Sequence, residues 1–180
     1  DGAPVDREKL RRITRTLSHR GPDGAATEVL GSVGLCHTRL AIIDLSPRGR
    51  QPMSSVDGRY WITYNGEVYN YVELRRELEL EGRQFRTQSD TEVILAAFTR
   101  WGPKAFARFN GMWGLAIWDT VDRRLILSRD RLGVKPLVYA RVGDVILFAS
   151  EIKALLAAEP SLAELDRIAR EGLRARKAKP

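Results

Sequence analysis

Hydrophobic and polar positions along the chain follow two different periods, which predict where helices and strands occur. Leu10, Ile13 and Leu17 recur at spacings of three and four residues, which predicts a helix that runs from its N-cap, Asp6, to about Ser18. The segment after it, HRGPDG, contains a proline and two glycines and is therefore predicted to be a loop.

Extended stretches dominate the rest of the pattern. Long apolar or alternating runs predict strands at VGLCHTRLAIIDL (33–45), YWITYN (60–65), MWGLAIWD (112–119), RLILSRD (124–130), LVYARV (137–142) and VILFAS (145–150). The last four lie in pairs around short polar turns, one near Asp122 and one at Gly143-Asp144, which is the pattern of two successive β-hairpins.

Two further helices are predicted by their N-terminal signals. Asn70 with Glu73 three residues later is a candidate capping box for a helix that Gly82 would end, and Ser89 with Glu92 repeats the device before TEVILAAFTRW. Strands that come as hairpins, rather than singly between helices, favour antiparallel sheets with helices packed outside. The predicted fold class is α+β.

Composition narrows the class of protein. The 180 residues are 43% hydrophobic, enough for one substantial domain, and the longest apolar runs are too short to span a membrane. The single cysteine excludes an internal disulfide, and the N-terminus lacks the pattern of a secretory signal, so we expect a cytoplasmic protein. The net charge of +7 comes from arginines spread among carboxylates, with a basic cluster only in the tail, so no nucleic-acid partner is expected.

The dipeptide Asn65-Gly66 allows two interpretations. Asn-Gly is the strongest short signal for a type I′ hairpin turn. The residues after Glu67 become helical too soon to leave room for a partner strand, however, and a side-chain amide beside an unhindered N–H has the two parts of an oxyanion hole. The residues alone leave both readings open.

Two charged residues pose a similar choice. Asp90 either caps the following helix or, if Ser89 takes that role, points its carboxylate at a ligand. Arg39 lies within a predicted apolar strand, where it either faces solvent at an edge or grips a carboxylate with two hydrogen bonds.

The cysteine and the two histidines are candidate catalytic groups. Cys36 is interpreted as a packed core thiol, because its neighbour His37 projects from the opposite face of a strand and cannot act as its base. His19 is expected to organise the loop in which it lies. Neither histidine has companions at metal-ligand spacing, so no metal site is predicted.

Six segments, in this order and spacing, resemble one family: HRGPDG, HTRLAIIDLSPRGRQPM, YNGEVYNYVELRREL, SDTEVILAAFTRWG, RFNGMWGLAIWD and SRDRLGVKPL. They are similar to the glutaminase domain of class II glutamine amidotransferases, in particular that of glutamine-hydrolysing asparagine synthetases. The resemblance runs from about His19 to Lys153. It implies the N-terminal-nucleophile hydrolase fold, a four-layer αββα sandwich of two antiparallel sheets between helices.

The resemblance also implies roles for particular residues. Asn65, through its side chain, and the Gly66 N–H would form the oxyanion hole, and Arg39 would hold the α-carboxylate of glutamine. Glu67 and Asp90 would face its α-ammonium group. Further contacts would come from the stretch that contains Leu40, Ile42 and Ile43.

In that family the nucleophile is an N-terminal cysteine on a first strand, and the resemblance implies that both would precede Asp1, so that this amidotransferase domain is expected to be N-terminally truncated. The implied domains are a glutamine amidotransferase domain, 1–157, and a basic tail or linker, 158–180. No cofactor is expected in this domain; ATP and Mg²⁺ belong to a synthetase domain that would act in cis or in trans. A homodimer is left open. The alternative is an inactive glutamine-binding or scaffolding module of the same fold.

Overall fold

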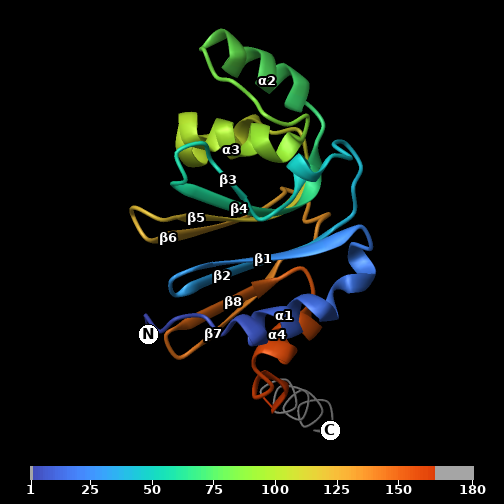
Figure 1. Ribbon diagram of the computed structural model, residues 1–180, viewed down its shortest axis with the longest axis vertical. Helices are drawn as coiled ribbons and strands as arrows, with labels where there is room; N and C mark the ends of the chain where they lie inside the picture. The colour runs from blue at the N-terminus through green and yellow to red at the C-terminus, as the bar shows by residue number, and fades with distance from the viewer. Residues whose placement is uncertain (1, 165–180) are drawn as a thin grey trace, which may run out of the picture.

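The computed structural model describes residues 2–164, which form four layers (Figure 1). In Figure 1, helices α2 and α3 cover one face of a sheet made of β3, β4, β5 and β6; below it lie the hairpins β1–β2 and β7–β8, and then helices α1 and α4. This order of layers confirms the predicted α+β class and its αββα arrangement, but the second strand layer consists of two separate hairpins where one sheet was predicted.

The first sheet is antiparallel throughout, in the order β3-β4-β5-β6. The elements of this half are β3 (Met53–Ser54), β4 (Tyr60–Val68), α2 (Tyr71–Leu80), α3 (Asp90–Trp101), the 3-10 helix η3 (Gly102–Arg108), β5 (Gly111–Asp119) and β6 (Arg124–Arg129). Alternate residues of β4 and β5, such as Ile62, Val68 and Leu115, are buried against α3, where Val93 and Ile94 are fully enclosed. The main core therefore lies between this sheet and α3.

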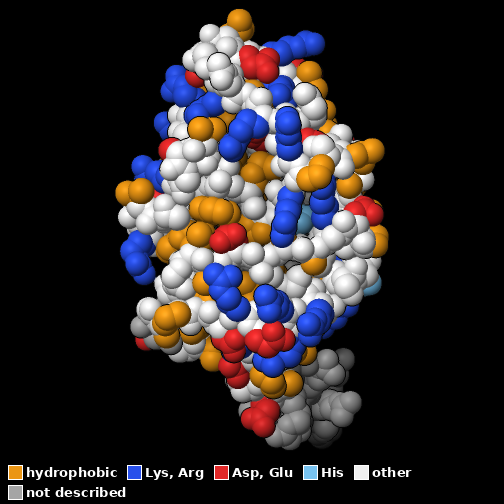
Figure 2. All heavy atoms as spheres, in the orientation of Figure 1, with side chains coloured by type: hydrophobic (Ala, Val, Ile, Leu, Met, Phe, Trp, Pro, Cys, Tyr) orange, Lys and Arg blue, Asp and Glu red, His pale blue; other side chains and the backbone are white. Residues whose placement is uncertain are grey.

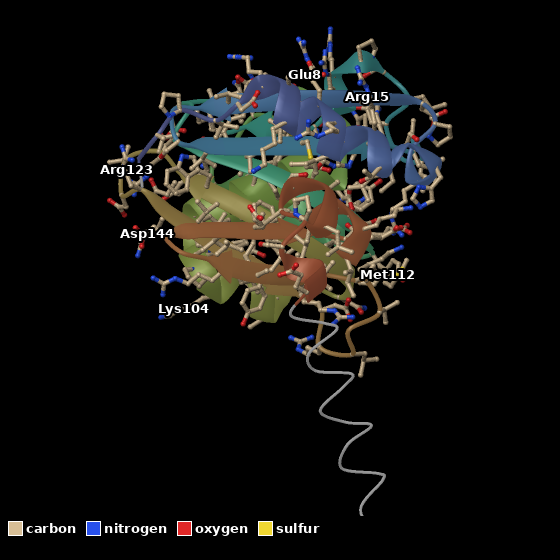
Figure 3. The ribbon with its side chains drawn as sticks, turned by 90° about the horizontal axis from the view of Figure 1, so that it is seen from below. Glu8, Arg15, Lys104, Met112, Arg123 and Asp144 are labelled. Carbon is tan, nitrogen blue, oxygen red and sulfur yellow. The ribbon has the colours of Figure 1, made fainter. Side chains whose placement is uncertain are left out.

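The other half is built from α1 (Arg7–Thr16), η1 (Ser18–Arg20), β1 (Gly24–Leu30), β2 (Val33–Arg39), β7 (Val138–Val142), β8 (Val145–Ala149) and α4 (Ile152–Ala158). A further 3-10 helix, η2 (Pro47–Gly49), precedes β3. Figure 3 shows α1 and α4 over the hairpins, with Glu8 and Arg15 on the outer surface of α1. The tips of the β5–β6 and β7–β8 hairpins, marked by Arg123 and Asp144, lie at the same end of the molecule.

The two hairpins of this half do not form one sheet. Among the described strands, β2 pairs only with β1, and β8 pairs only with β7. A cavity of about 610 Å³ is lined by residues of β2 and β8, by β4 and β5 of the other sheet, and by α1 and α4. We call this space the inter-hairpin cavity.

The surface carries both signs of charge. Figure 2 shows Lys and Arg side chains scattered over the visible face with Asp and Glu side chains among them, rather than one basic patch. Within residues 2–164, no helix is long and apolar enough to cross a membrane. The predicted basic tail, 158–180, falls mostly outside the described residues and stays a prediction.

Several local predictions are confirmed. Asp6 caps α1 by accepting hydrogen bonds from Glu8 N and Lys9 N, and both predicted hairpins form. Ser89 caps α3 through Thr91 N, but Glu92 does not complete a capping box. Its carboxylate instead accepts hydrogen bonds from the backbone of residues 86 and 87 and fixes the loop before α3.

Other local predictions are wrong, each for a physical reason. Asn70 precedes α2 without a side-chain cap, because its amide bridges Arg108 O and Asn110 N across the chain. The extended stretch predicted over 33–45 ends at Arg39. Beyond it, hydrogen bonds from Ala41 N to Asp23 and from Ser46 N to Asp44 turn the backbone into a loop. The structure also contains β1, which was not predicted because the polar residues in its ATEVL segment obscure the pattern of a strand.

Candidate active site

A second cavity, of about 420 Å³, collects every residue for which the resemblance implies a role. Its lining includes Arg39, Leu40, Ile42, Ile43, Asn65, Gly66, Glu67 and Asp90. These residues come from the end of β2, the loop after it, β4 and the first turn of α3. We call this space the substrate cavity.

Asn65 and Gly66 lie inside strand β4, paired with Gly114 and Trp113 of β5, so the turn interpretation is wrong. On the edge of β4 that faces away from β5, Tyr64 N donates to Gln51 Oε1 at 2.7 Å and Val68 N donates to Asp90 Oδ2 at 3.1 Å. Since N–H groups two residues apart point to the same side of a strand, the Gly66 N–H faces this edge between them.

The Asn65 side chain supplies a second donor beside that N–H. Its Nδ2 atom is buried and has no hydrogen-bond partner among the described residues. A buried amide without a partner carries a desolvation cost of roughly 1–3 kcal/mol, which a bound acceptor would offset. Asn65 lines both the substrate cavity and the inter-hairpin cavity, so its side chain borders the space that a ligand would occupy.

Packing against β5 requires glycine at position 66. A Cβ built there would lie 2.1 Å from Met112 O and 2.8 Å from Trp113 Cα. Both are backbone atoms of β5 and cannot swing aside. The close approach of the two strands therefore requires glycine at this position, independently of any ligand.

One side of the substrate cavity is acidic. Asp90 is 4% exposed, and its Oδ2 accepts hydrogen bonds from the Tyr64 hydroxyl at 2.8 Å and from Val68 N. Burial raises the pKa of Asp90, those two hydrogen bonds lower it, and the nearby Glu67 carboxylate raises it again. A cation placed between Glu67 and Asp90 would offset the cost of holding two carboxylates together.

Arg39 stands at the end of β2, with its guanidinium held by the backbone. Its Nη2 donates to the carbonyl of Asp44, and a Cβ added to Gly49 would lie 2.8 Å from the same nitrogen. The guanidinium thus occupies the space that glycine leaves open. Arg20 and Lys135 also line the substrate cavity, so it has basic groups as well as the acidic side.

The loop of residues 40–45 forms part of the wall. Leu40 and Ile42 are exposed, unlike core positions of a strand, whereas Ile43 is partly buried. Asp44 fixes the loop, because its carboxylate accepts hydrogen bonds from Ser46 N and from Gln88 N before α3. A hydrogen bond with the Ser46 side chain, followed by the one from Gln88 N, holds the pKa of Asp44 below its ordinary value.

His19 joins the HRGPDG loop to the start of α4. Its Nε2 lies 3.0 Å from Glu151 Oε1, which also accepts a hydrogen bond from Arg20 at 2.9 Å. Glu151 further pairs with Lys153 at 3.0 Å, and these partners lower its pKa to about 2. The cluster fixes a loop whose Gly21 approaches the Thr38 backbone too closely for a Cβ.

The Cys36 thiol points away from the substrate cavity. It is hydrogen-bonded to Thr14 of α1, and burial raises its pKa, which favours the protonated thiol over the nucleophilic thiolate. His37 projects from the opposite face of β2 toward Tyr64 of β4, as the alternation of a strand requires. Among the described residues, no group of three or more His, Cys, Asp or Glu side chains is arranged to hold a metal ion.

Sequence reasoning missed three residues of this site: Gln51, Tyr64 and Gly49, all of which line it or border Arg39. Gln51 is buried and also donates to Thr91 Oγ1 at 3.2 Å, so it ties β4 to α3. All three lie within segments that carry the family resemblance, Gly49 and Gln51 in HTRLAIIDLSPRGRQPM and Tyr64 in YNGEVYNYVELRREL. Their local sequence does not show what they contact, because their partners lie in other segments.

The model of the family described as "Glutamine amidotransferase domain" matches residues 2–177. The chain belongs to this family. It is 42% identical over 164 residues to asparagine synthetase [glutamine-hydrolyzing] 1 of Bacillus subtilis, and 40% identical over 174 residues to the putative asparagine synthetase [glutamine-hydrolyzing] 2 of Methanocaldococcus jannaschii.

These alignments cover most of this amidotransferase domain but a small part of each relative. The first covers 91% of the chain and 26% of the relative, and the second covers 87% and 33%. The chain therefore spans about a quarter to a third of the length of these relatives, whose names describe the whole proteins.

A solved structure supports the fold. Glutamine phosphoribosylpyrophosphate amidotransferase from B. subtilis superimposes with a TM-score of 0.74 over 87% of this chain and 42% of that one, at 24% sequence identity. At this identity the likeness establishes the N-terminal-nucleophile hydrolase fold only.

Proposed function

We propose that this glutamine amidotransferase domain binds L-glutamine in the substrate cavity and presents its side-chain amide for hydrolysis to glutamate and ammonia. The observation that carries the proposal is the unpartnered Asn65 Nδ2 beside the Gly66 N–H, in a cavity that also holds Arg39, Glu67 and Asp90. Two donors, one guanidinium and two carboxylates are what glutamine requires.

The charged groups match the two ends of an amino acid. Arg39 holds the α-carboxylate, since a guanidinium offers a planar pair of donors to two carboxylate oxygens. Glu67 and Asp90 face the α-ammonium, whose positive charge offsets the cost of ionising Asp90, the carboxyl whose pKa burial raises. Leu40, Ile42 and Ile43 close the wall beside the bound amino acid.

The two donors of β4 serve the reacting amide. When a nucleophile attacks the amide carbon, negative charge develops on the oxygen, and donors already aimed there stabilise the transition state more than the substrate. Asn65 is held in place by nine register pairs between β4 and β5, so it needs little reorganisation.

The attacking thiol is proposed to arrive on an extended segment in the inter-hairpin cavity. This cavity lies between β2 and β8 and meets the substrate cavity at Asn65, which lines both. Cys36 does not serve, because its thiol faces α1 and its pKa is raised. Residues 1–180 alone are therefore expected to bind glutamine without hydrolysing it.

The ammonia released is proposed to amidate aspartate in an ATP- and Mg²⁺-dependent synthetase domain, joined in cis or in trans, in the cytoplasm. Similarity to asparagine synthetases over most of the chain supports this acceptor. The alternative, an inactive glutamine-binding module, shares the same cavity and differs only in the missing nucleophile.

Calorimetric titration of the 180-residue chain with L-glutamine tests the binding step. We expect binding that weakens by roughly tenfold or more in Arg39→Met, because a charge-assisted pair is lost. Arg141→Met is the matched control, since Arg141 lies exposed on β7 and pairs only weakly with Asp144. No heat of binding with the unsubstituted chain, or an equal loss in both variants, would contradict the proposed site.

A second measurement separates the enzyme from the inactive module. Ammonia release is assayed with the 180-residue chain alone and with a protein that contains this chain and has the full length of its relatives. Hydrolysis by the longer protein alone supports the enzyme, and hydrolysis by neither supports the module. Hydrolysis by the 180-residue chain would overturn the proposed origin of the thiol.

A further inference from the structure

We propose that His37 determines specificity for a carboxamide, by accepting a hydrogen bond from the amide NH₂ while Asn65 donates to the amide oxygen. This inference rests on the proposed glutamine site and names the group that reads the other half of the amide. It begins from two atoms. Among the described residues, the buried side-chain nitrogens or oxygens without a hydrogen-bond partner are His37 Nδ1 and Asn65 Nδ2.

The tautomer of His37 follows from its other ring nitrogen. Nε2 lies 3.2 Å from the carbonyl oxygen of Tyr64, and a carbonyl can only accept, so Nε2 carries the proton. Burial lowers the pKa of His37 to about 4, and the Arg39 charge acts in the same direction. The ring is therefore neutral at physiological pH, and Nδ1 is a bare acceptor.

His37 lies beside Asn65, one of the two proposed oxyanion donors. His37 contacts the carbonyl of Tyr64, the residue directly before Asn65, and His37 and Asn65 both line the two cavities where these meet. A second hydrogen bond, from Thr63 Oγ1 to Cys36 O at 3.0 Å, ties the same two strands together. β2 and β4 thus hold His37 and Asn65 in a fixed relation.

The two unpartnered atoms are complementary to an amide. Asn65 Nδ2 is a donor and His37 Nδ1 is an acceptor, whereas a carboxamide offers one oxygen acceptor and one NH₂ donor. A carboxylate or an ester offers only acceptors at that end, so one oxygen would face the lone pair of Nδ1 and leave it unsatisfied. Leaving a buried polar atom unpaired is how a site rejects a close analogue.

The same pair explains why the product would leave. Hydrolysis replaces the amide NH₂ by an oxygen, which removes the donor that Nδ1 needs. Glutamate is therefore expected to bind more weakly than glutamine, with the α-carboxylate and α-ammonium contacts unchanged. The discrimination lies at the side-chain end of the ligand alone.

The first test is spectroscopic and needs no ligand. Ring ¹⁵N–¹H correlation spectra of the ¹⁵N-labelled 180-residue chain, assigned by loss of signal in His37→Gln, report which nitrogen carries the proton. We expect the Nε2–H form at pH 7. A ring protonated at Nδ1 would overturn the inference whatever the chain binds.

The second test measures affinity for L-glutamine and for its γ-methyl ester, which keeps the carbonyl and lacks N–H donors. His37→Gln places an amide near Nε2 and loses the acceptor at Nδ1, whereas His37→Asn keeps an oxygen near Nδ1 and loses the contact with Tyr64. We expect the chain to prefer glutamine by roughly tenfold, the Gln variant to lose that preference, and the Asn variant to keep it.

The outcomes separate this inference from the function on which it rests. If neither ligand binds, both the proposed site and the role of His37 fail. If glutamine binds but the ester binds equally well, only the role of His37 fails. A purely structural histidine would show the reverse order of variants, with the Asn variant binding worst and the preference for the amide unchanged in both.

Discussion

The Tyr64 hydroxyl donates a 2.8 Å hydrogen bond to Asp90 Oδ2, and both side chains are 4% exposed. This contact joins the strand that carries Asn65 to the helix that carries the acidic side of the substrate cavity. Burial together with the Asp90 charge raises the pKa of Tyr64, so the phenol remains a proton donor at any physiological pH.

Replacing Tyr64 by Phe removes one hydrogen bond that lowers the pKa of Asp90. We expect that pKa to rise further, so that Asp90 ionises, and glutamine binding strengthens, only at higher pH than in the unsubstituted chain. The free energy of unfolding should fall by about 1 kcal/mol. Calorimetric titration with L-glutamine between pH 5 and 8 checks this; a pH profile that superimposes on the original would refute it.

Gly49→Ala tests how Arg39 is positioned. The added Cβ would lie 2.8 Å from Arg39 Nη2, and the flexible end of that side chain must move. We expect glutamine affinity to fall by roughly tenfold because the charge-assisted contact is misplaced, while the free energy of unfolding changes by less than about 1 kcal/mol.

The control for Gly49→Ala is Arg48→Ala, an exposed neighbour in the same 3-10 helix that does not line the substrate cavity. Affinity and thermal unfolding are measured on both variants. Unchanged affinity in Gly49→Ala, or an equal change in Arg48→Ala, would mean that this glycine does not position the guanidinium.

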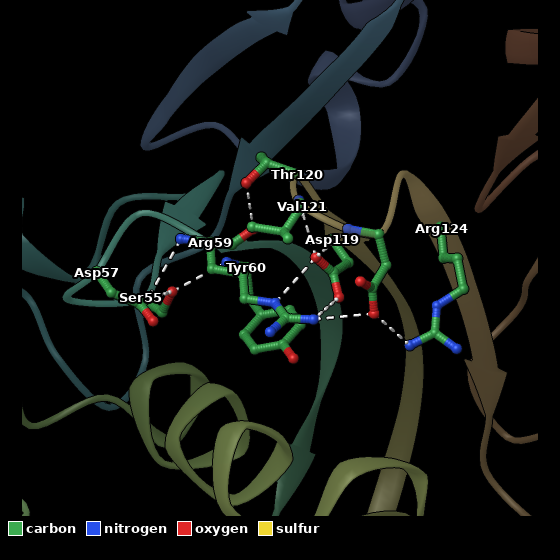
Figure 4. A network of polar contacts seen from close by, with 9 residues as sticks. Ser55, Asp57, Arg59, Tyr60, Asp119, Thr120, Val121 and Arg124 are labelled. Atoms are coloured by element: carbon green, nitrogen blue, oxygen red, sulfur yellow. Dashed lines mark hydrogen bonds and ion pairs between the residues drawn. The ribbon is translucent and has the colours of Figure 1, made fainter.

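Stability at low pH depends on the pair formed by Arg59 and Asp119 (Figure 4). The Asp119 carboxylate is fully buried and accepts hydrogen bonds from Arg59 Nε at 3.0 Å and Nη2 at 2.8 Å, and from Val121 N and Asp122 N. The bond with Arg59 is the main cause that lowers the pKa of Asp119 from 3.8 to about 2. The contribution to folding is thus complete above about pH 4 and is lost as the pH falls toward 2.

Asp119→Asn should therefore cost about 2 kcal/mol of unfolding free energy at pH 7, since a buried charge-assisted pair is replaced by weaker neutral contacts. The difference from the original chain should narrow as the pH falls from about 4 to 2. Denaturant unfolding at several pH values measures this. A difference that stays constant over that range would contradict the role given to the charge.

Much of the secondary structure is predictable because its causes are local. Asp6 and Ser89 cap their helices with side chains that reach two or three residues along the chain, and the β5–β6 and β7–β8 hairpins turn over a few polar residues. The predictions that failed concern residues whose partners are distant. Asn70 bridges to residues 108 and 110, and Glu92 is used by the loop before it.

For the candidate site, the order and spacing of six segments were sufficient to name eight residues, and the structure brings all eight to one cavity. The residues that hold them in place, Gln51, Tyr64 and Gly49, lie in the same segments, but their local sequence does not show what they contact. Each acts through a contact between segments that the folded chain brings together.

The sequence by itself determined the α+β class, the caps formed by Asp6 and Ser89, the hairpins and the family, because these depend on periodicity, on neighbouring residues and on motif order. Only the tertiary structure decided that Asn65-Gly66 is strand rather than turn, since that depends on pairing with β5, about fifty residues later in the chain. It likewise decided that Asn65 Nδ2 and His37 Nδ1 have no hydrogen-bond partner within residues 2–164. Hydrogen-bond satisfaction is a property of the whole packed arrangement, and no local pattern encodes it.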